Sequence, residues 1–392
     1  MPGAPNFYEF PKNKSYIAGF FAPIFDEITD RNVMTIDAFD WLHRTGKNPA
    51  DQPDEDLCKS RPARPFTYES VFGHEWQHLL ESYSDPDEVT WVNEGLSMFA
   101  ETLDGYTDTR RNVRQTGAQS GIFCFNGFGT VKGPANPNPT PCGGPENSLT
   151  SWGDEGPGSE ILADYGNAWS FMLFLYDRYG LAFMSALHRD GAHQGLAGVQ
   201  AQLDHYASGT KVADVVHDYQ LMTVVDRAVD TKAGTVTGIA KSRVVNSYLD
   251  SAVNFANPTT HELPGAGANG ADYFKLPVTG DKLKTLTFTG DPTVLAPSGD
   301  GGGLFGSDTS APAAVGNWHL TVVGLDAAHH RAVVKSVDKA FSASLSAKDL
   351  KAFAGYPVLV AIVSHDNPDD LNAAAEAPAG YQLKVNGKAI EG

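Results

Sequence analysis

Over the first 257 residues, apolar positions recur mainly three or four residues apart, which is the spacing of one face of a helix. A β-branched run from Arg31 to Phe39 predicts a strand before the helices. Gly180 directly follows one helical pattern and suits the position after a helix C-terminus. The predicted helices are Thr67 to Tyr83, Trp91 to Leu103, Glu160 to Tyr179, Phe183 to Arg189, Leu196 to Tyr206 and Val212 to Val229. We therefore expect an α+β unit with a helix-rich second half.

The pattern changes near Asn257-Pro258, after which helical spacing largely stops. Short runs of alternating apolar and polar residues follow, separated by Gly, Pro, Asn and Asp clusters. They lie at Tyr273 to Val278, Leu283 to Thr289, Trp318 to Val323, Ala332 to Val337, Val358 to Val363 and Tyr381 to Val385. This pattern is typical of a β-sandwich. We expect two domains, one over residues 1–257 and an all-β sandwich over residues 258–392.

A Gly- and Pro-rich stretch from Gly127 to Ser159 interrupts the first domain. Such a composition excludes a helix or a central strand and predicts a long surface loop. The three cysteines, Cys58, Cys124 and Cys142, have loop-like surroundings and are too far apart for a CxxC metal site. We expect one disulfide and favour Cys58–Cys124, because Cys142 lies within the Asn-Pro repeats of this loop; three reduced thiols remain the alternative.

Composition and charge restrict the classes of molecule that the chain is expected to bind. The chain has 29 Lys and Arg against 47 Asp and Glu, a formal charge of −18, so nucleic acid and anionic membranes would be repelled. Its 41% hydrophobic residues suffice for a core, and no apolar run approaches the roughly 18 residues of a membrane-spanning helix. The N-terminus, Met1 to Asn6, lacks the pattern of a signal peptide, which leaves a cytosolic protein or a processed secreted chain open.

The sequence His74-Glu75-Trp76-Gln77-His78 places two imidazoles at positions i and i+4, on one helix face, where both can bind one metal ion. The alternative is two surface histidines on an amphipathic helix. Apolar residues occupy more than one side of this helix, namely Tyr68, Val71, Phe72, Trp76, Leu79 and Leu80. We therefore expect a buried helix, in which bare imidazoles would need partners.

A catalytic zinc site needs a third protein ligand and one position left for water. After a polar turn, Ser84 to Glu88, a second apolar-faced helix carries Glu94 near its start. The 15 residues between His78 and Glu94 allow the first helix to end, turn and return antiparallel. Glu94 is then expected to face the two histidines.

His74 to His78 followed by Trp91-Val92-Asn93-Glu94-Gly95 resembles the gluzincin zinc metallopeptidases, whose third ligand is the Glu of a W-x-N-E-G segment. The Gln77-His78-Leu79-Leu80 context and the short spacing look most like the secreted bacterial hyicolysin-type branch. The resemblance covers about residues 65–180. It implies a thermolysin-like catalytic domain, with His74, His78 and Glu94 as zinc ligands and Glu75 as general base.

Two further residues complete the expected site. Glu101 lies seven residues after Glu94 on the same helix face, and similar enzymes have a carboxylate there. We expect it to accept a hydrogen bond from a ligand imidazole, the alternative being a solvated helix residue. Tyr165, in a Y-x-x-A setting at the start of a buried helix, resembles the catalytic tyrosine of related gluzincins and would donate to the oxyanion. A core tyrosine is its alternative.

The remaining candidate residues point to ordinary surface features. His193, His205 and His217 lie in polar helical segments and are expected at the surface, and His329-His330 is expected in a turn rather than at a second metal site. The acidic, Gly-rich loop from Asp300 to Gly303, with Asp308 nearby, could hold calcium. It has no regular spacing of oxygen ligands, so a solvated loop is the main expectation.

These features predict a secreted zinc endopeptidase that acts on proteins or peptides, with a C-terminal domain that binds a surface or substrate. The Gly-x-Met-Glu-Asn segment with which the related aminopeptidases recognise a free amine is absent. The strand Asn32 to Asp37 could instead pair with an extended peptide. An aminopeptidase of the same clan and an inactive zinc-containing adhesion or binding protein are the alternatives; Glu75 argues against the latter, because a structural site needs no base.

Overall fold

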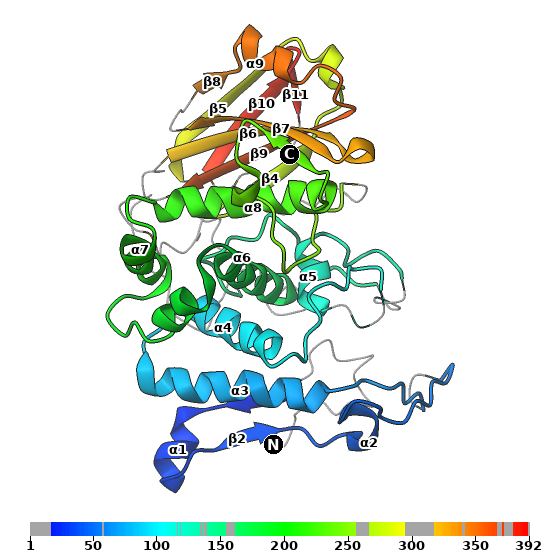
Figure 1. Ribbon diagram of the computed structural model, residues 1–392, viewed down its shortest axis with the longest axis vertical. Coiled ribbons are helices and arrows are strands. Elements are labelled where there is room, and N and C mark those ends of the chain that lie inside the picture. Colours follow the sequence, from blue (N-terminus) through cyan, green and yellow to red (C-terminus); the bar gives the residue numbers. More distant parts are fainter. Residues whose placement is uncertain are drawn as a thin grey trace.

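The computed structural model describes residues 17–56, 59–115, 117, 119–133, 136, 139–153, 161–255, 266–294, 317–338, 342–366, 371 and 379–390. The chain is mixed α+β. Its elements follow one another along the long axis of the molecule (Figure 1). At one end lie helix α3 (Thr67–Ser84) and an antiparallel pair of short strands, β1 (Gly19–Phe21) and β2 (Met34–Ile36), which we call the β1–β2 hairpin although α1 connects them. Further helices fill the middle, and two sheets lie at the other end.

The N-terminal half contains most of the helices. The elements in chain order are β1 (Gly19–Phe21), α1 (Pro23–Thr29), β2 (Met34–Ile36), α2 (Trp41–Arg44), α3 (Thr67–Ser84), α4 (Thr90–Leu103), α5 (Ser120–Phe125), α6 (Ile161–Leu187), α7 (Gly195–Tyr206) and α8 (Val212–Val229). The expected helices are confirmed to within a few residues at each end. At Gly180 the backbone of α6 adopts a φ of 78°, which breaks the helix where the sequence predicted its end.

The C-terminal half contains two sheets. Its elements are β3 (Thr235–Thr237), β4 (Ala271–Lys275), β5 (Leu286–Val294), β6 (Asn317–Asp326), β7 (Arg331–Asp338), β8 (Ser342–Ser344), α9 (Ala347–Ala352), β9 (Val358–Asp366), β10 (Ala379–Val385) and β11 (Lys388–Ile390). One sheet has the order β11-β10-β5-β8 and the other β3-β7-β6-β9-β4. Every strand expected from the alternating pattern is present.

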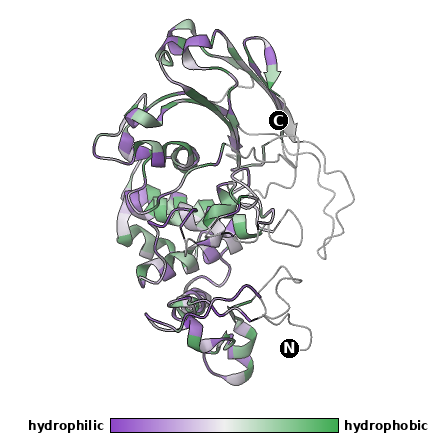
Figure 2. Cartoon of the chain, turned by 90° about the vertical axis from the view of Figure 1, so that its right-hand side faces the viewer, coloured by the Kyte–Doolittle hydropathy of each residue, from purple (hydrophilic) through white to green (hydrophobic). Residues whose placement is uncertain are grey.

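The five-stranded sheet is buried on both faces. Alternate residues of β6 belong to different apolar clusters: Val322 packs with Phe288 and Leu383 of the other sheet, whereas Val323 packs with Val224 of α8. Side chains of successive strand residues point to opposite faces, so a strand covered on both faces, such as β9, needs apolar residues at nearly every position. This double burial explains the continuous apolar run of β9, and the strands of the sheets are mainly green in Figure 2.

The two halves are joined closely. Strand β3 precedes the expected boundary at residue 257, yet it pairs in parallel with β7 and extends the five-stranded sheet. Helix α8 of the first half covers the sheet face opposite the second sheet (Figure 1). Their contact surface is therefore an apolar core rather than a hinge.

Helix α3 lies between the β1–β2 hairpin and α4 (Figure 1). The expectation that it is buried on several sides is wrong. Tyr68 and Leu79 are buried, but Phe72, Trp76 and Leu80 are each more than 40% exposed. Trp76 and Leu80 line an open groove toward α4 and α6, which leaves this side of α3 uncovered.

The stretch from Gly127 to Ser159 has no helix or strand among its described residues, as expected, and residues 130–132 are exposed, but another part of it is not at the surface. Residues 147–151 are buried. Asn147 donates a hydrogen bond of 2.9 Å to Asp164 of α6, and Ser148 donates one to the carbonyl of Ala268 beside the sheets. Residues 147–151 are buried because they lie between α6 and the start of the β-rich half.

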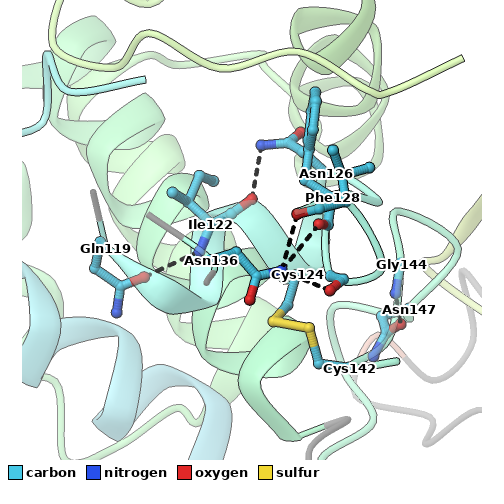
Figure 3. Close-up of a disulfide and its surroundings, with 11 residues drawn as sticks. Gln119, Ile122, Cys124, Asn126, Phe128, Asn136, Cys142, Gly144 and Asn147 are labelled. Atoms are coloured by element: carbon cyan, nitrogen blue, oxygen red, sulfur yellow. Dashed lines mark hydrogen bonds between the residues drawn. A yellow bond between two sulfur atoms is a disulfide. The ribbon is translucent and has the colours of Figure 1, made fainter. Parts of the chain in front are cut away.

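The disulfide joins Cys124 to Cys142, so the favoured Cys58–Cys124 pairing is wrong (Figure 3). Cys58 lies outside the described residues. Cys124 lies in the short helix α5 rather than in a loop and is fully buried. Asn136 is held near the end of α5 because its amide donates a hydrogen bond of 2.6 Å to the carbonyl of Gly129. That contact and the packing of residues 147–151 bring Cys142 to Cys124.

No helix in the described parts of the chain is both long and apolar enough to cross a membrane. This agrees with the sequence-based expectation for membrane-spanning segments.

Candidate metal centre

His74 and His78 of α3 face Glu94 of α4, as the spacing predicted. The Nε2 atoms of His74 and His78 lie 3.2 and 3.5 Å from the same oxygen, Oε2 of Glu94. The two imidazole rings are edge-on to each other, with 4.8 Å between their centroids. The side chains are 15–18% exposed, so the site is enclosed but can be reached from solvent.

Each imidazole is fixed by a hydrogen bond at its other nitrogen. Nδ1 of His74 lies 2.9 Å from Oε1 of Glu101, the residue predicted to accept from a ligand imidazole. Oε2 of the same carboxylate accepts hydrogen bonds from Ser70 and Thr107. Glu101 is therefore held in place by α3 and by the segment after α4, and it is not a solvated helix residue.

The partners of His78 were not found from the sequence. Its Nδ1 lies 2.6 Å from Oδ1 of Asn93 and 3.1 Å from the hydroxyl of Ser97. Asn93 directly precedes Glu94, and Ser97 lies one turn after Glu94 on the same helix. These two polar residues in an otherwise apolar helix were the sequence signal from which the partners of His78 could have been predicted. Both contacts direct Nε2 of His78 toward Glu94.

The protonation of His74 and of Glu94 each depends on the charges of the neighbouring residues in the group. Burial lowers the pKa of His74, but hydrogen bonds and charge interactions with Glu101 and Glu94 outweigh it and raise the pKa to about 10. Burial raises the pKa of Glu94, but the two histidines lower it to about 2. These shifts favour a protonated, positively charged His74 between the carboxylates of Glu94 and Glu101. The position between the two carboxylates therefore favours a positive charge.

The donor set fits a zinc ion. Among the described residues, His74, His78 and Glu94 form a group whose potential ligand atoms all lie within 4.8 Å of one another. Two neutral imidazole nitrogens and one carboxylate oxygen are the three protein ligands of many catalytic zinc sites. The hydrogen bonds at both Nδ1 atoms turn the Nε2 atoms toward Glu94, which is the orientation that such outer contacts produce; Nε2 of His78 also lies 3.3 Å from the Ser97 hydroxyl.

Glu75 lies beside this group, on the side of the N-terminal hairpin. Its side chain is 4% exposed, and burial raises the pKa of its carboxyl while the nearby histidines lower it. The backbone N–H of Phe21 in β1 donates a hydrogen bond to it. Gly19 approaches it so closely that an added Cβ would lie 3.1 Å from Oε1 of Glu75. Strand β1 therefore contacts this carboxylate directly, a contact that the sequence did not reveal.

Tyr165 of α6 also faces the group. Burial, together with a hydrogen bond to Glu94 and the negative charge of that carboxylate, raises the pKa of the phenol well above its ordinary value. The hydroxyl therefore stays protonated and remains a donor. Its ring packs edge-on against Trp152, with 4.9 Å between centroids, which fixes the direction of the hydroxyl.

The other candidate residues have mixed outcomes. His193 and His205 are exposed, and His329-His330 forms a turn, as expected. The expectation for His217 is wrong: it is half-buried, and its ring stacks against His319 of β6 because α8 packs on the sheet. With Asp366, these two histidines form another possible metal-binding group. The loop from Asp300 to Gly303 and Asp308 lies outside the described residues.

No model of a known protein family matches this sequence, and no curated protein is significantly similar to it.

Proposed function

We propose that the chain is a zinc-dependent peptidase of the gluzincin type, with His74, His78 and Glu94 as metal ligands. The observation that carries the proposal is the convergence of both Nε2 atoms on one oxygen of Glu94, with each Nδ1 held by a separate acceptor. A chance pair of surface histidines would not have both rings oriented in this way. The remaining coordination position would be open to water, as a catalytic site requires.

Zinc bound there would polarise the scissile carbonyl and lower the pKa of the attacking water. Glu75 is the group placed to take the proton of that water as its oxygen bonds to the carbonyl carbon. The same carboxyl then gives the proton to the amine nitrogen as the carbon–nitrogen bond breaks. Burial and the adjacent hairpin hold Glu75 in position, and its raised pKa brings it closer to the range in which a carboxylate can accept and return a proton.

Tyr165 is proposed to stabilise the negative oxygen that develops on the substrate carbonyl. A neutral phenol beside Glu94 can donate a hydrogen bond to such an oxygen without first losing its proton. The contact with Trp152 fixes the ring in advance, which reduces the reorganisation needed during reaction.

The substrate strand is proposed to pair with the β1–β2 hairpin. The sequence favoured Asn32 to Asp37 for this role, but β1 is the strand that contacts Glu75. Among the described residues, no third strand joins this hairpin. An extended peptide beside β1 would gain main-chain hydrogen bonds without needing a free chain end, which favours internal cleavage.

The wider architecture belongs to the same proposal. We propose that residues 1–257 form a thermolysin-like catalytic domain, which also contributes β3 to the adjoining sheet, and that residues 258–392 form a β-sandwich accessory domain that binds a surface or substrate. The disulfide supports a secreted protein, because such bonds persist mainly in oxidising compartments.

The test is cleavage by zinc-loaded protein of an unbiased peptide library in two forms, one with free ends and one blocked by N-acetylation and C-amidation. We expect internal cleavage, with acetylation leaving kcat/KM nearly unchanged. Removal of single residues from unblocked N-termini alone would indicate an aminopeptidase. Zinc binding without any cleavage would indicate an inactive zinc-containing protein.

A further inference from the structure

Three carboxylates converge at the turn between α3 and α4, outside the candidate zinc site. They belong to Glu81 in the last turns of α3, Asp85 at its C-terminal cap, and Glu88 just before α4. One potential ligand atom from each lies within 4.8 Å of the other two. Glu81 and Asp85 are both 1% exposed, so these acids are not the solvated turn that their sequence suggests.

Donors hold one oxygen of each carboxylate. Oε2 of Glu81 accepts from the amide of Gln77 at 2.7 Å, and His188 also contacts it. Oε1 of Glu88 accepts from two backbone N–H groups, its neighbour's at 2.6 Å and that of Gly195 at 2.8 Å. A weaker contact of 3.4 Å joins Oδ1 of Asp85 to a glutamine amide. These bonds fix the direction of each carboxylate.

The other oxygens of the two buried acids have no such donor. Oε1 of Glu81 and Oδ2 of Asp85 are fully buried and make no hydrogen bond with any described residue. Leaving a buried carboxylate oxygen without a donor or cation is unfavourable. Burial raises the pKa of Glu81 and raises that of Glu88 to about 7, and the charge of Asp85 raises both further. His188 pairs with Oε2 of Glu81 and lowers the pKa of that carboxyl, but in the described parts of the chain no ion pair reaches Asp85 or Glu88.

We propose that Glu81, Asp85 and Glu88 bind a calcium ion. All three ligands are carboxylates, and hard oxygen donors favour calcium or magnesium over zinc. Calcium accepts about six to eight oxygens in flexible geometry, so one oxygen from each carboxylate can be supplemented by water, whereas magnesium requires a near-ideal octahedron. Glu81, Asp85 and Glu88 come from the end of α3 and the turn before α4, so their positions are not octahedral by design. This irregular arrangement fits calcium better than magnesium.

The position of the site gives the ion a structural role. It lies one turn beyond His78, and the amide of Gln77 contacts both Glu81 and the Ser97 hydroxyl, which in turn contacts His78. Bound calcium would fasten the end of α3 to the start of α4, the two helices that carry His74, His78 and Glu94. The proposal does not depend on peptidase activity, because it concerns ion binding and stability alone.

The experiment measures calcium binding and thermal unfolding of zinc-loaded protein in calcium-free buffer, with calcium added from roughly 0.1 µM to 10 mM. We expect binding that raises the Tm by roughly 3 °C when calcium exceeds its Kd about 100-fold. Asp85→Asn and Glu81→Gln should weaken this binding at least about 100-fold and abolish the Tm shift, and Glu88→Gln should weaken it. The exposed Asp87 lies in the same turn, so Asp87→Asn is the matched control and should behave as wild type.

The unfolding temperature of Asp85→Asn in calcium-free buffer distinguishes loss of a calcium ligand from damaged packing. Without calcium, Asp85→Asn should unfold at the same temperature as wild type or higher, because it removes one of three mutually repelling charges. The proposal is overturned if wild type shows no calcium-dependent shift, which would mean that bound protons satisfy the carboxyls. It is also overturned if calcium binds equally well to Asp85→Asn and Glu81→Gln, since the ion would then lie elsewhere in the chain.

Discussion

Nδ1 of His74 donates a hydrogen bond of 2.9 Å to Oε1 of Glu101, two helical turns beyond Glu94 on α4. This contact fixes the ring so that its Nε2 faces Glu94, 3.2 Å away. Glu101 thereby acts on the metal centre through His74 rather than by touching the ion.

Glu101→Gln is expected to weaken zinc binding by about 10- to 100-fold, because an amide is a poorer acceptor and does not increase the basicity of the imidazole as a carboxylate does. Competition with a chromophoric chelator measures the zinc Kd. Glu27→Gln, an exposed site on α1, is the control and should leave the Kd unchanged. Equal affinities for wild type and Glu101→Gln would return Glu101 to a purely structural role.

Tyr165→Phe is expected to lower kcat by roughly 10²- to 10³-fold while KM and zinc content change little, since only the oxyanion donor is removed. The ring and its contact with Trp152 are retained, so the fold should be preserved. Steady-state kinetics on one blocked peptide measure the split between kcat and KM. Tyr206→Phe, which removes an exposed hydroxyl on α7, is the control; similar rates for both variants would contradict a role for Tyr165 in catalysis.

The disulfide gives a stability prediction. Replacing Cys124 and Cys142 together by Ala should lower the free energy of unfolding by about 3 kcal/mol, the value for a loop closed over a similar span, because the unfolded chain regains the freedom that the bond removes. Urea unfolding measures the change, with Cys58→Ala as control. Non-reducing peptide mapping should recover Cys124 linked to Cys142; a bridge to Cys58 would show that the pairing is different.

Much of the metal centre follows from local sequence. His74 and His78 are four residues apart on a helix and must share a face, and the spacing to Glu94 allows one turn between antiparallel helices. Glu101 follows from the same periodicity. The strands could be predicted because turns punctuate their alternating runs, and double burial of one sheet explains why β9 is apolar throughout.

What could not be predicted depends on contacts between distant segments. The bridge between Cys124 and Cys142 depends on how the chain after α5 returns to it, including the contact of Asn147 with Asp164 of α6, which no local pattern records. His217 was expected at the surface because a histidine beside Asp218 on a helix is usually solvated, whereas it packs against His319 of the sheet. Asp85 likewise belongs to an ordinary polar turn in sequence, and only the packing of α7 and the 188–195 segment against that turn buries it.

The central claim is that Glu75 moves the proton at a zinc centre formed by His74, His78 and Glu94. It is tested most directly by comparing zinc content and peptide cleavage in wild type, Glu75→Gln and Glu94→Ala. Glu75→Gln should retain zinc at this site and its fold but cleave a blocked peptide roughly 10²- to 10⁴-fold more slowly, because only the proton carrier is lost. Glu94→Ala should bind one zinc fewer than wild type and show no cleavage. Undiminished cleavage by Glu75→Gln, or full activity of metal-free wild type, would contradict the account.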